Sequence, residues 1–229
     1  MTTSTRSAGI AIACATILSI IFVALDSEAL GKKPQEIMQS MIAMRAMKGL
    51  VHGVAIASVL SYIFGFATLA QKLDLRRPLV LGGLTTYLVG SVAMIGATIL
   101  DGFISTDVAQ AFVGASPEGV KTGYNLIVFA GIALTDLAKL GWVLQAIGTC
   151  AWAVSLVAER GFARAVAYIG LASGTLVLAA VFSSGANMGV AAILSILVAQ
   201  ALWNLAAAAL LFRSRPMQAA ASLRAAQPA

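Results

Sequence analysis

Charged residues are scarce in this chain. They make up 10% of its 229 residues, whereas hydrophobic residues make up 60% and the mean hydropathy is +0.93. A soluble domain is about 45–50% apolar and about 25% charged, and one globule of this size could not bury so much apolar surface. The composition therefore excludes an ordinary soluble domain and predicts an integral membrane protein.

Histidine and cysteine are almost absent. Histidine occurs once, as His52, which excludes bis-histidine haem but leaves a His–Met pair open. Cys14 and Cys150 each lie in an apolar stretch without a CxxC neighbour, so we predict buried small side chains rather than a disulfide framework or a zinc site. No P-loop, HExxH or Gly-x-Ser-x-Gly motif is present, so hydrolase and ATPase chemistry has no visible residues, and we expect no enzymatic activity.

Six apolar stretches are long enough to cross a membrane, which takes about 20 helical residues. We predict spans over about residues 8–25, 49–70, 79–100, 136–158, 165–182 and 190–212, within one domain of residues 1–215 that is followed by a flexible tail, 216–229. Ser27-Glu28-Ala29 has the small residues of a signal-peptide cleavage site, but two acids precede it, so we expect an uncleaved first span.

The basic residues indicate the orientation. With the N-terminus inside, the cytoplasmic segments contain nine lysines and arginines (Arg6, Lys72, Arg76, Arg77, Arg160, Arg164, Arg213, Arg215 and Arg224) and the outer segments five (Lys32, Lys33, Arg45, Lys48 and Lys121). Because basic residues are retained on the cytoplasmic side, we predict a multi-pass protein of the bacterial inner membrane with both termini cytoplasmic. The net charge of +6 then reflects topology, and we expect no nucleic-acid partner.

Three helices are predicted to be longer than the membrane is thick. Pro34 with Glu36, Pro78, and Ser116-Pro117-Glu118 are typical helix starts. From these starts the helical pattern runs to about residues 71, 113 and 158, which exceeds the bilayer by some 25 Å. We predict an all-α membrane protein whose helices 2–4 extend beyond the outer membrane face as a bundle. In the alternative, Gly49, Gly102 or Gly123 breaks them into interfacial pieces.

Ionisable residues at membrane depth are costly and therefore candidates for function. Pairing the helical hairpins by residue number places Lys48 opposite Asp101 and Asp136 opposite Ala97, near one level at the outer edge of the hydrocarbon. This polar layer is predicted to contain His52, Asp101, Asp136 and Lys139, with Arg45 and Lys48 on the same helix face as His52. It is either an ion-pair network that fixes the helix register or a site that relays protons or binds a ligand or headgroup.

Methionines recur every three residues before His52, at Met38, Met41, Met44 and Met47. Thioether and imidazole ligands suit Cu(I), and Met94 is a further donor from another helix. Steps of three residues point Met38 and Met47 in opposite directions, so one helix cannot bring these ligands to one metal. We therefore favour helix packing or partner contact for the methionines, with copper or haem as the alternative cofactors.

Together these features predict a small, non-enzymatic multi-spanning membrane protein. We expect it to bind a small ligand, a lipid headgroup or a partner protein at the polar layer on the outer side of the bundle. The alternatives are a copper or redox protein that uses His52 and the methionines, and an accessory subunit of a larger membrane complex. Its expected partners are the lipid bilayer and either a second copy or another membrane subunit.

Overall fold

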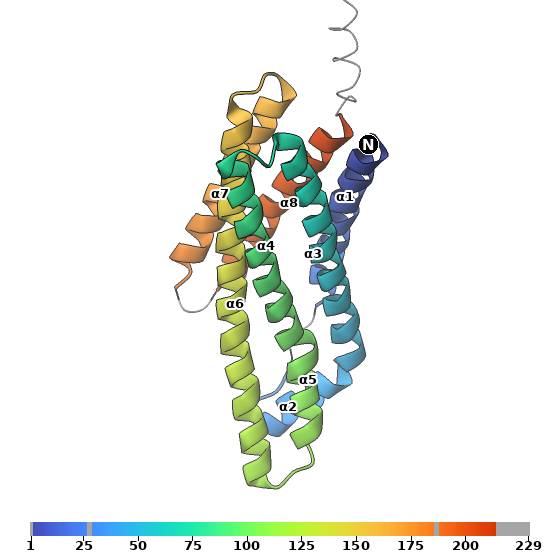
Figure 1. Ribbon diagram of the computed structural model, residues 1–229. Helices are drawn as coiled ribbons and strands as arrows, with labels where there is room; N and C mark the ends of the chain where they lie inside the picture. The colour runs from blue at the N-terminus through green and yellow to red at the C-terminus, as the bar shows by residue number, and fades with distance from the viewer. Residues whose placement is uncertain (1, 27–28, 186–187, 214–229) are drawn as a thin grey trace, which may run out of the picture.

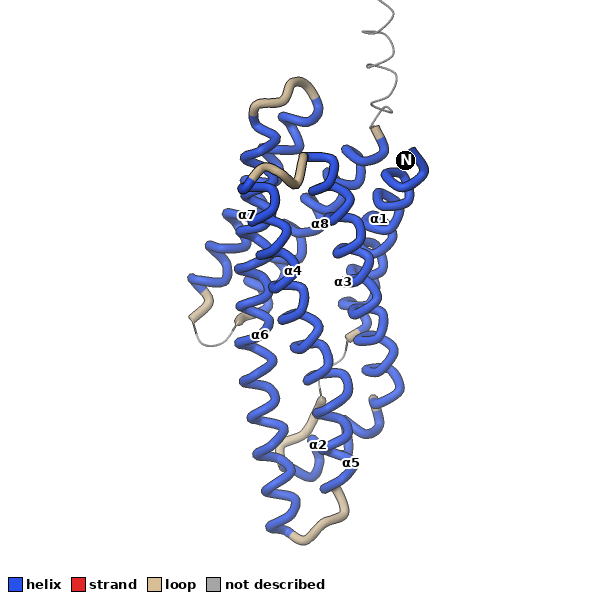
Figure 2. The backbone as a smooth tube through the Cα atoms, in the orientation of Figure 1, coloured by secondary structure: helices blue, strands red, loops and turns tan. Residues whose placement is uncertain are grey.

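The computed structural model describes residues 2–26, 29–185 and 188–213, and every regular element within them is a helix (Figures 1 and 2). The elements are α1 (Thr2–Leu25), α2 (Pro34–Ala43), α3 (Arg45–Leu73), α4 (Pro78–Ile99), the π-helix η1 (Leu100–Ile104), α5 (Ser105–Phe112), α6 (Pro117–Val157), α7 (Phe162–Ser183) and α8 (Val190–Phe212). Within these described ranges, six segments are long and apolar enough to span a membrane: Thr5–Leu25, Arg45–Leu73, Pro78–Phe112, Pro117–Val157, Phe162–Ser183 and Ala191–Phe212. The chain is an all-α, multi-spanning membrane bundle. The tail predicted at 216–229 lies outside the described residues.

Two of the predicted helix starts have the expected caps. Helix α2 begins at Pro34, and the Glu36 carboxylate accepts hydrogen bonds from the backbone N–H groups of Lys32 (2.9 Å) and Lys33 (3.3 Å). Helix α6 begins at Pro117, and Ser116 Oγ accepts from the backbone N–H of Gly119 at 3.3 Å. These bonds satisfy N–H groups that have no partner within a helix.

One end of the molecule extends beyond the ends of α7 and α8 (Figure 1). Helices α7 and α8 run beside only one half of α6, which has 41 residues and a length of about 62 Å (Figure 1). The other half of α6 packs against α5 and α2. We call α2, α5 and residues 117–138 of α6 the extension. Its core contains Met38, Met41 and Ala109, with Phe112 and Tyr124 packed against them.

The long helices are continuous only in part. The run predicted from Pro34 to about Gln71 is divided at Met44, where φ −94° and ψ 1° end α2 before α3 begins. The break therefore lies ahead of Gly49, which is inside α3, as Gly123 is inside α6. Between α4 and α5 the backbone changes to the wider π-helix η1, which includes Gly102, and the direction of the helix is maintained (Figure 1).

The main apolar core lies in the half of the bundle away from the extension. The ring of Phe66 stacks on Trp152 at 5.3 Å and on Trp203 at 6.0 Å, with Tyr87 tilted against both Phe66 and Trp152. These rings join α3, α4, α6 and α8. Cys14 was predicted to be buried but is exposed on α1, and this side of α1 also exposes apolar residues such as Ile10 and Ile17.

Candidate functional site: a charged cluster beside an interfacial groove

A cluster of charged side chains lies where α3 crosses η1. Lys48 Nζ donates a hydrogen bond to Asp101 Oδ1 at 3.1 Å and lies 3.8 Å from Asp26 Oδ1. His52 Nε2 lies 3.0 Å from Asp101 Oδ2. The side chains of Lys48 and His52 are 9% and 8% exposed, and that of Asp101 is 29% exposed. We call these four residues the charged cluster.

The hydrogen bonds of His52 fix where its protons are. Nδ1 lies 2.9 Å from the backbone oxygen of Lys48, and because a carbonyl only accepts, Nδ1 must be the donor. An unprotonated Nε2 and a carboxylate oxygen are both acceptors. The hydrogen bond between Nε2 and Asp101 therefore requires a proton either on Nε2 or on the carboxyl group. One proton therefore lies in the His52–Asp101 contact. With that proton, the two positive and two negative charges of the cluster balance, which suits the burial of Lys48 and His52.

Gly102 allows the two helices to approach at this point. A Cβ atom added to Gly102 would lie 2.4 Å from the Cβ and 2.5 Å from the Cγ of His52. The wider turn of η1 places Asp101 and Gly102 together against α3, and Ser105 Oγ donates to the oxygen of Leu100 at 2.8 Å within the same turn. Single π-turns of this kind are frequent at functional sites.

Asp26 is the one member of the charged cluster that the sequence pattern does not indicate. It follows the last residue of α1, so it reaches the cluster only through the packing of α1 against α3. One carboxylate or ring atom from each of Asp26, His52 and Asp101 lies within 4.8 Å of the others, which is a grouping compatible with a metal ion. The ammonium of Lys48 already lies within 4 Å of both carboxylates, so a metal ion would have to displace it.

The structure separates the other predicted residues from this cluster. Arg45 forms an ion pair with Asp107 at 2.8 Å and a hydrogen bond with Gln110, both in α5. Lys139 donates to the backbone oxygen of Gly185, in the connection between α7 and α8. Asp136 is exposed on α6. Three of the six predicted residues are therefore in direct contact, and Arg45 lies about one turn further along α3.

The methionines occupy different surroundings. Met38 and Met41 are buried in the core of the extension, Met44 forms the break between α2 and α3, and Met47 is 48% exposed. Met94 packs on α6, where a Cβ at Gly141 would lie 2.7 Å from its sulfur. Both ring nitrogens of His52 already have oxygen partners. This placement fits packing roles and gives no support to the copper or haem alternative.

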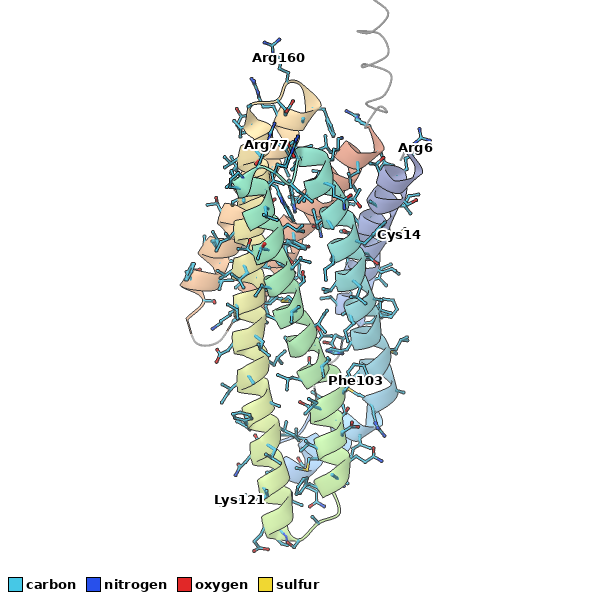
Figure 3. The ribbon with its side chains drawn as sticks, in the orientation of Figure 1. Arg6, Cys14, Arg77, Phe103, Lys121 and Arg160 are labelled. Carbon is cyan, nitrogen blue, oxygen red and sulfur yellow. The ribbon has the colours of Figure 1, made fainter. Side chains whose placement is uncertain are left out.

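A groove of about 510 Å³ lies beside the charged cluster, between α2 and α3 on one side and η1 and α5 on the other. We call it the interfacial groove. Its lining is mostly apolar with one ion pair, and consists of Ile42, Ala43, Arg45, Ala46, Gly49, Gly102, Phe103, Thr106 and Asp107. Gly49 leaves room in it, since a Cβ at this position would meet nothing within 4 Å, whereas a Cβ at Gly102 would meet His52. Figure 3 labels Phe103 between the middle of the molecule and the end that carries Lys121.

No protein-family model, no curated protein and no solved structure matches this chain.

Proposed function

We propose that this protein binds the phosphate-bearing headgroup of a membrane lipid in the interfacial groove and has no catalytic activity. The observation that supports this function most directly is the groove's lining, in which one arginine and one aspartate are placed among apolar side chains and glycines. Apolar walls suit acyl chains or glycerol carbons, whereas the ion pair suits a charged headgroup.

The depth of Arg45 matches the headgroup layer. Lys48 contacts Asp26 at the end of α1, and Lys139 contacts Gly185 after the end of α7, so the membrane face is expected to pass near these residues. Arg45 lies three residues beyond Lys48, which is about 4.5 Å along the helix. The headgroup layer is about 5–8 Å thick on each side of the hydrocarbon, so Arg45 lies within it.

Arg45 has the chemistry that phosphate recognition requires. Its planar guanidinium can donate two parallel hydrogen bonds to phosphate oxygens. Its present partner, Asp107, is 61% exposed and Arg45 itself is 50% exposed, so their ion pair contributes little stability and exchanges readily. Asp107 is placed to accept from the ammonium of an ethanolamine headgroup, and we therefore expect phosphatidylethanolamine to bind better than phosphatidylcholine.

Gly49 gives a test that leaves the fold intact. Gly49→Leu is expected to fill the groove, because its Cβ meets open space and leucine favours a helix. Gly53→Leu is the matched control, since Gly53 lies one turn away in α3, also has open space at its Cβ, and does not line the groove. Native mass spectrometry of detergent-solubilised protein with added phosphatidylethanolamine measures the bound lipid.

We expect lipid to be retained by the wild type and Gly53→Leu, lost in Gly49→Leu and reduced in Arg45→Gln. Equal retention by Gly49→Leu and Gly53→Leu would contradict the proposal. Inorganic phosphate at the same concentration is the second arm of the experiment. If it displaced the lipid, a soluble anion rather than a lipid would be the ligand.

A second candidate function is that of an accessory subunit that docks through the extension. On the extension part of α6, Leu126, Phe129 and Ile132 are 44%, 69% and 58% exposed. An apolar face of this kind beyond the expected membrane level is typical of a partner contact. The contact would not be the methionine stripe, because Met38 and Met41 are buried. Phe129→Glu is expected to abolish co-purification of a partner in mild detergent, and an unchanged set of co-purifying proteins would contradict this candidate.

A further inference from the structure

A small cavity lies inside the membrane-spanning part of the bundle, apart from the charged cluster and the interfacial groove. Its volume is about 40 Å³, and it is bordered by residues of α3, α4, α6, α7 and α8. Its lining includes no charged residue but an unusual number of polar ones, chiefly Gln145, Thr149, Ser173, Gln200, Asn204 and Trp203.

Some of these polar groups are joined by hydrogen bonds. Gln200 Nε2 donates to Gln145 Oε1 at 3.1 Å, and Gln145 Nε2 donates to Ser91 Oγ at 3.2 Å. This chain of bonds links α8, α6 and α4 across the bundle. Gln145 and Ser91 are 7% and 0% exposed, so the bond between them is buried, whereas Gln200 is half-buried.

Other polar groups around the cavity have no hydrogen-bond partner among the described residues. The indole N–H of Trp203 makes no hydrogen bond to any described residue, although the residue is only 2% exposed. The side chains of Thr149, Ser173 and Asn204, which are 5%, 4% and 7% exposed, form no hydrogen bond within the part of the chain that the structure describes. An unsatisfied buried hydroxyl or amide costs about 1–3 kcal/mol in protein mutational data.

The cavity lies at a depth where such groups have no access to bulk water. Gln145 and Thr149 are six and ten residues along α6 from Lys139, which lies near the membrane face. At 1.5 Å per residue these positions are about 9 and 15 Å deep, and the centre of the hydrocarbon layer is about 15 Å from its edge. Polar groups at this depth must be satisfied within the protein or by enclosed water.

We propose that this cavity binds a cluster of about three ordered water molecules, which hydrogen-bond the indole of Trp203 and the side chains of Thr149, Ser173 and Asn204. A water molecule requires about 10–15 Å³ of such space and two to four polar partners, and the cavity supplies both. It is too small for a lipid or a drug-sized ligand, and its uncharged lining does not suit an ion. The water cluster completes the hydrogen bonding that joins α6, α7 and α8 in the middle of the membrane.

The three tryptophans allow a test with an internal control. In ¹⁵N-tryptophan-labelled protein in deuterated detergent, cross-relaxation between water and each indole proton is measured by NMR. The Trp203 indole is expected to show a water cross-peak. The Trp152 indole, which is equally buried but donates to the backbone oxygen of Val80 at 3.3 Å, is expected to show none. Trp203→Phe assigns the signal and retains a ring that stacks on Phe66.

A substitution of equal volume tests the polar lining. Thr149→Val keeps the shape of the side chain and removes a partner of the water, so the Trp203 cross-peak is expected to weaken or disappear. Thr68→Val is the control, because Thr68 is also buried, bonds to the oxygen of Phe64 and lies outside the cavity. Absence of the cross-peak at Trp203 in the wild type would overturn the proposal. A peak of equal strength at Trp152 would also do so, because water would then penetrate the bundle generally.

Discussion

Replacing Gly102 by alanine tests whether its contact with His52 requires glycine. The added Cβ would lie 2.4 Å from the Cβ of His52, and the neighbour that must move belongs to the backbone-proximal part of a buried ring rather than to a flexible chain end. Overpacking of this kind costs about 1–3 kcal/mol. Gly49→Ala is the matched variant, since its Cβ meets nothing within 4 Å.

In both variants alanine stabilises the helical backbone by about 0.5–1 kcal/mol relative to glycine. This contribution cancels when the stabilities of the two variants are compared. Gly102→Ala is therefore expected to be about 1–3 kcal/mol less stable than Gly49→Ala. Unfolding in mixed detergent micelles, followed by tryptophan fluorescence, measures the difference. As a second readout, selective ¹⁵N-histidine labelling detects only His52, and its ring signals are expected to shift in Gly102→Ala alone. Equal stabilities together with unchanged histidine signals would refute the reasoning.

Three other predictions follow from charged residues. Lys48→Met removes the cation beside two carboxylates and is expected to cost up to about 3 kcal/mol of stability. Because the ammonium no longer occupies the site, Zn²⁺ should raise the melting temperature of this variant more than that of the wild type. If the variant were as stable as the wild type, Lys48 would not stabilise the charged cluster. At the turn between α3 and α4, a side-chain hydrogen bond from Arg76 lowers the pKa of Asp74. The resulting stability is present above the unfolded-state pKa of about 3.9 and is lost as the pH falls through the lower folded-state pKa. Carbon-13 titration should show this pKa rise in Arg76→Gln, and no rise would contradict the assignment. Lys121 and Arg160 lie at opposite ends of the molecule (Figure 3). In a background without the native cysteines, Lys121→Cys is expected to react with an impermeant maleimide added outside intact cells and Arg160→Cys is not; the reverse would contradict the proposed orientation.

Much of the fold follows from features that are local in the sequence. Apolar runs of membrane length indicate the spans, and proline followed by an acid marks the starts of α2 and α6. Counting residues along a hairpin predicts which residues of two straight helices lie at the same level, because the rise per residue is constant. The contact between Lys48 and Asp101 agrees with that count. The count also pairs Ala97 with Asp136. In the structure the residues next to them are close, because a Cβ at Gly96 would lie 3.4 Å from Leu137.

The remaining features depend on tertiary packing that has no local signal. Methionine favours helices, so nothing in the sequence marks the break at Met44. The π-turn at η1 accommodates the approach of Gly102 to His52, which a periodic pattern cannot show. Asp26 enters the charged cluster only because α1 packs against α3. Counting residues along a hairpin gives the position of a side chain along the helix axis, but not the side of the helix from which it projects. Asp136 and Lys139 are therefore expected at the level of the charged cluster, although they do not contact it.

Solid-state NMR on protein reconstituted in phosphatidylethanolamine bilayers tests lipid binding in the interfacial groove most directly. With ¹⁵N-arginine labelling, dephasing of the guanidinium signals by ³¹P reports which arginines contact a phosphate, and the difference between wild type and Arg45→Gln isolates the Arg45 signal. Strong dephasing of that signal is expected, and it should be lost in Gly49→Leu but kept in Gly53→Leu. An Arg45 signal that ³¹P does not dephase in the wild type would contradict lipid phosphate binding in the groove.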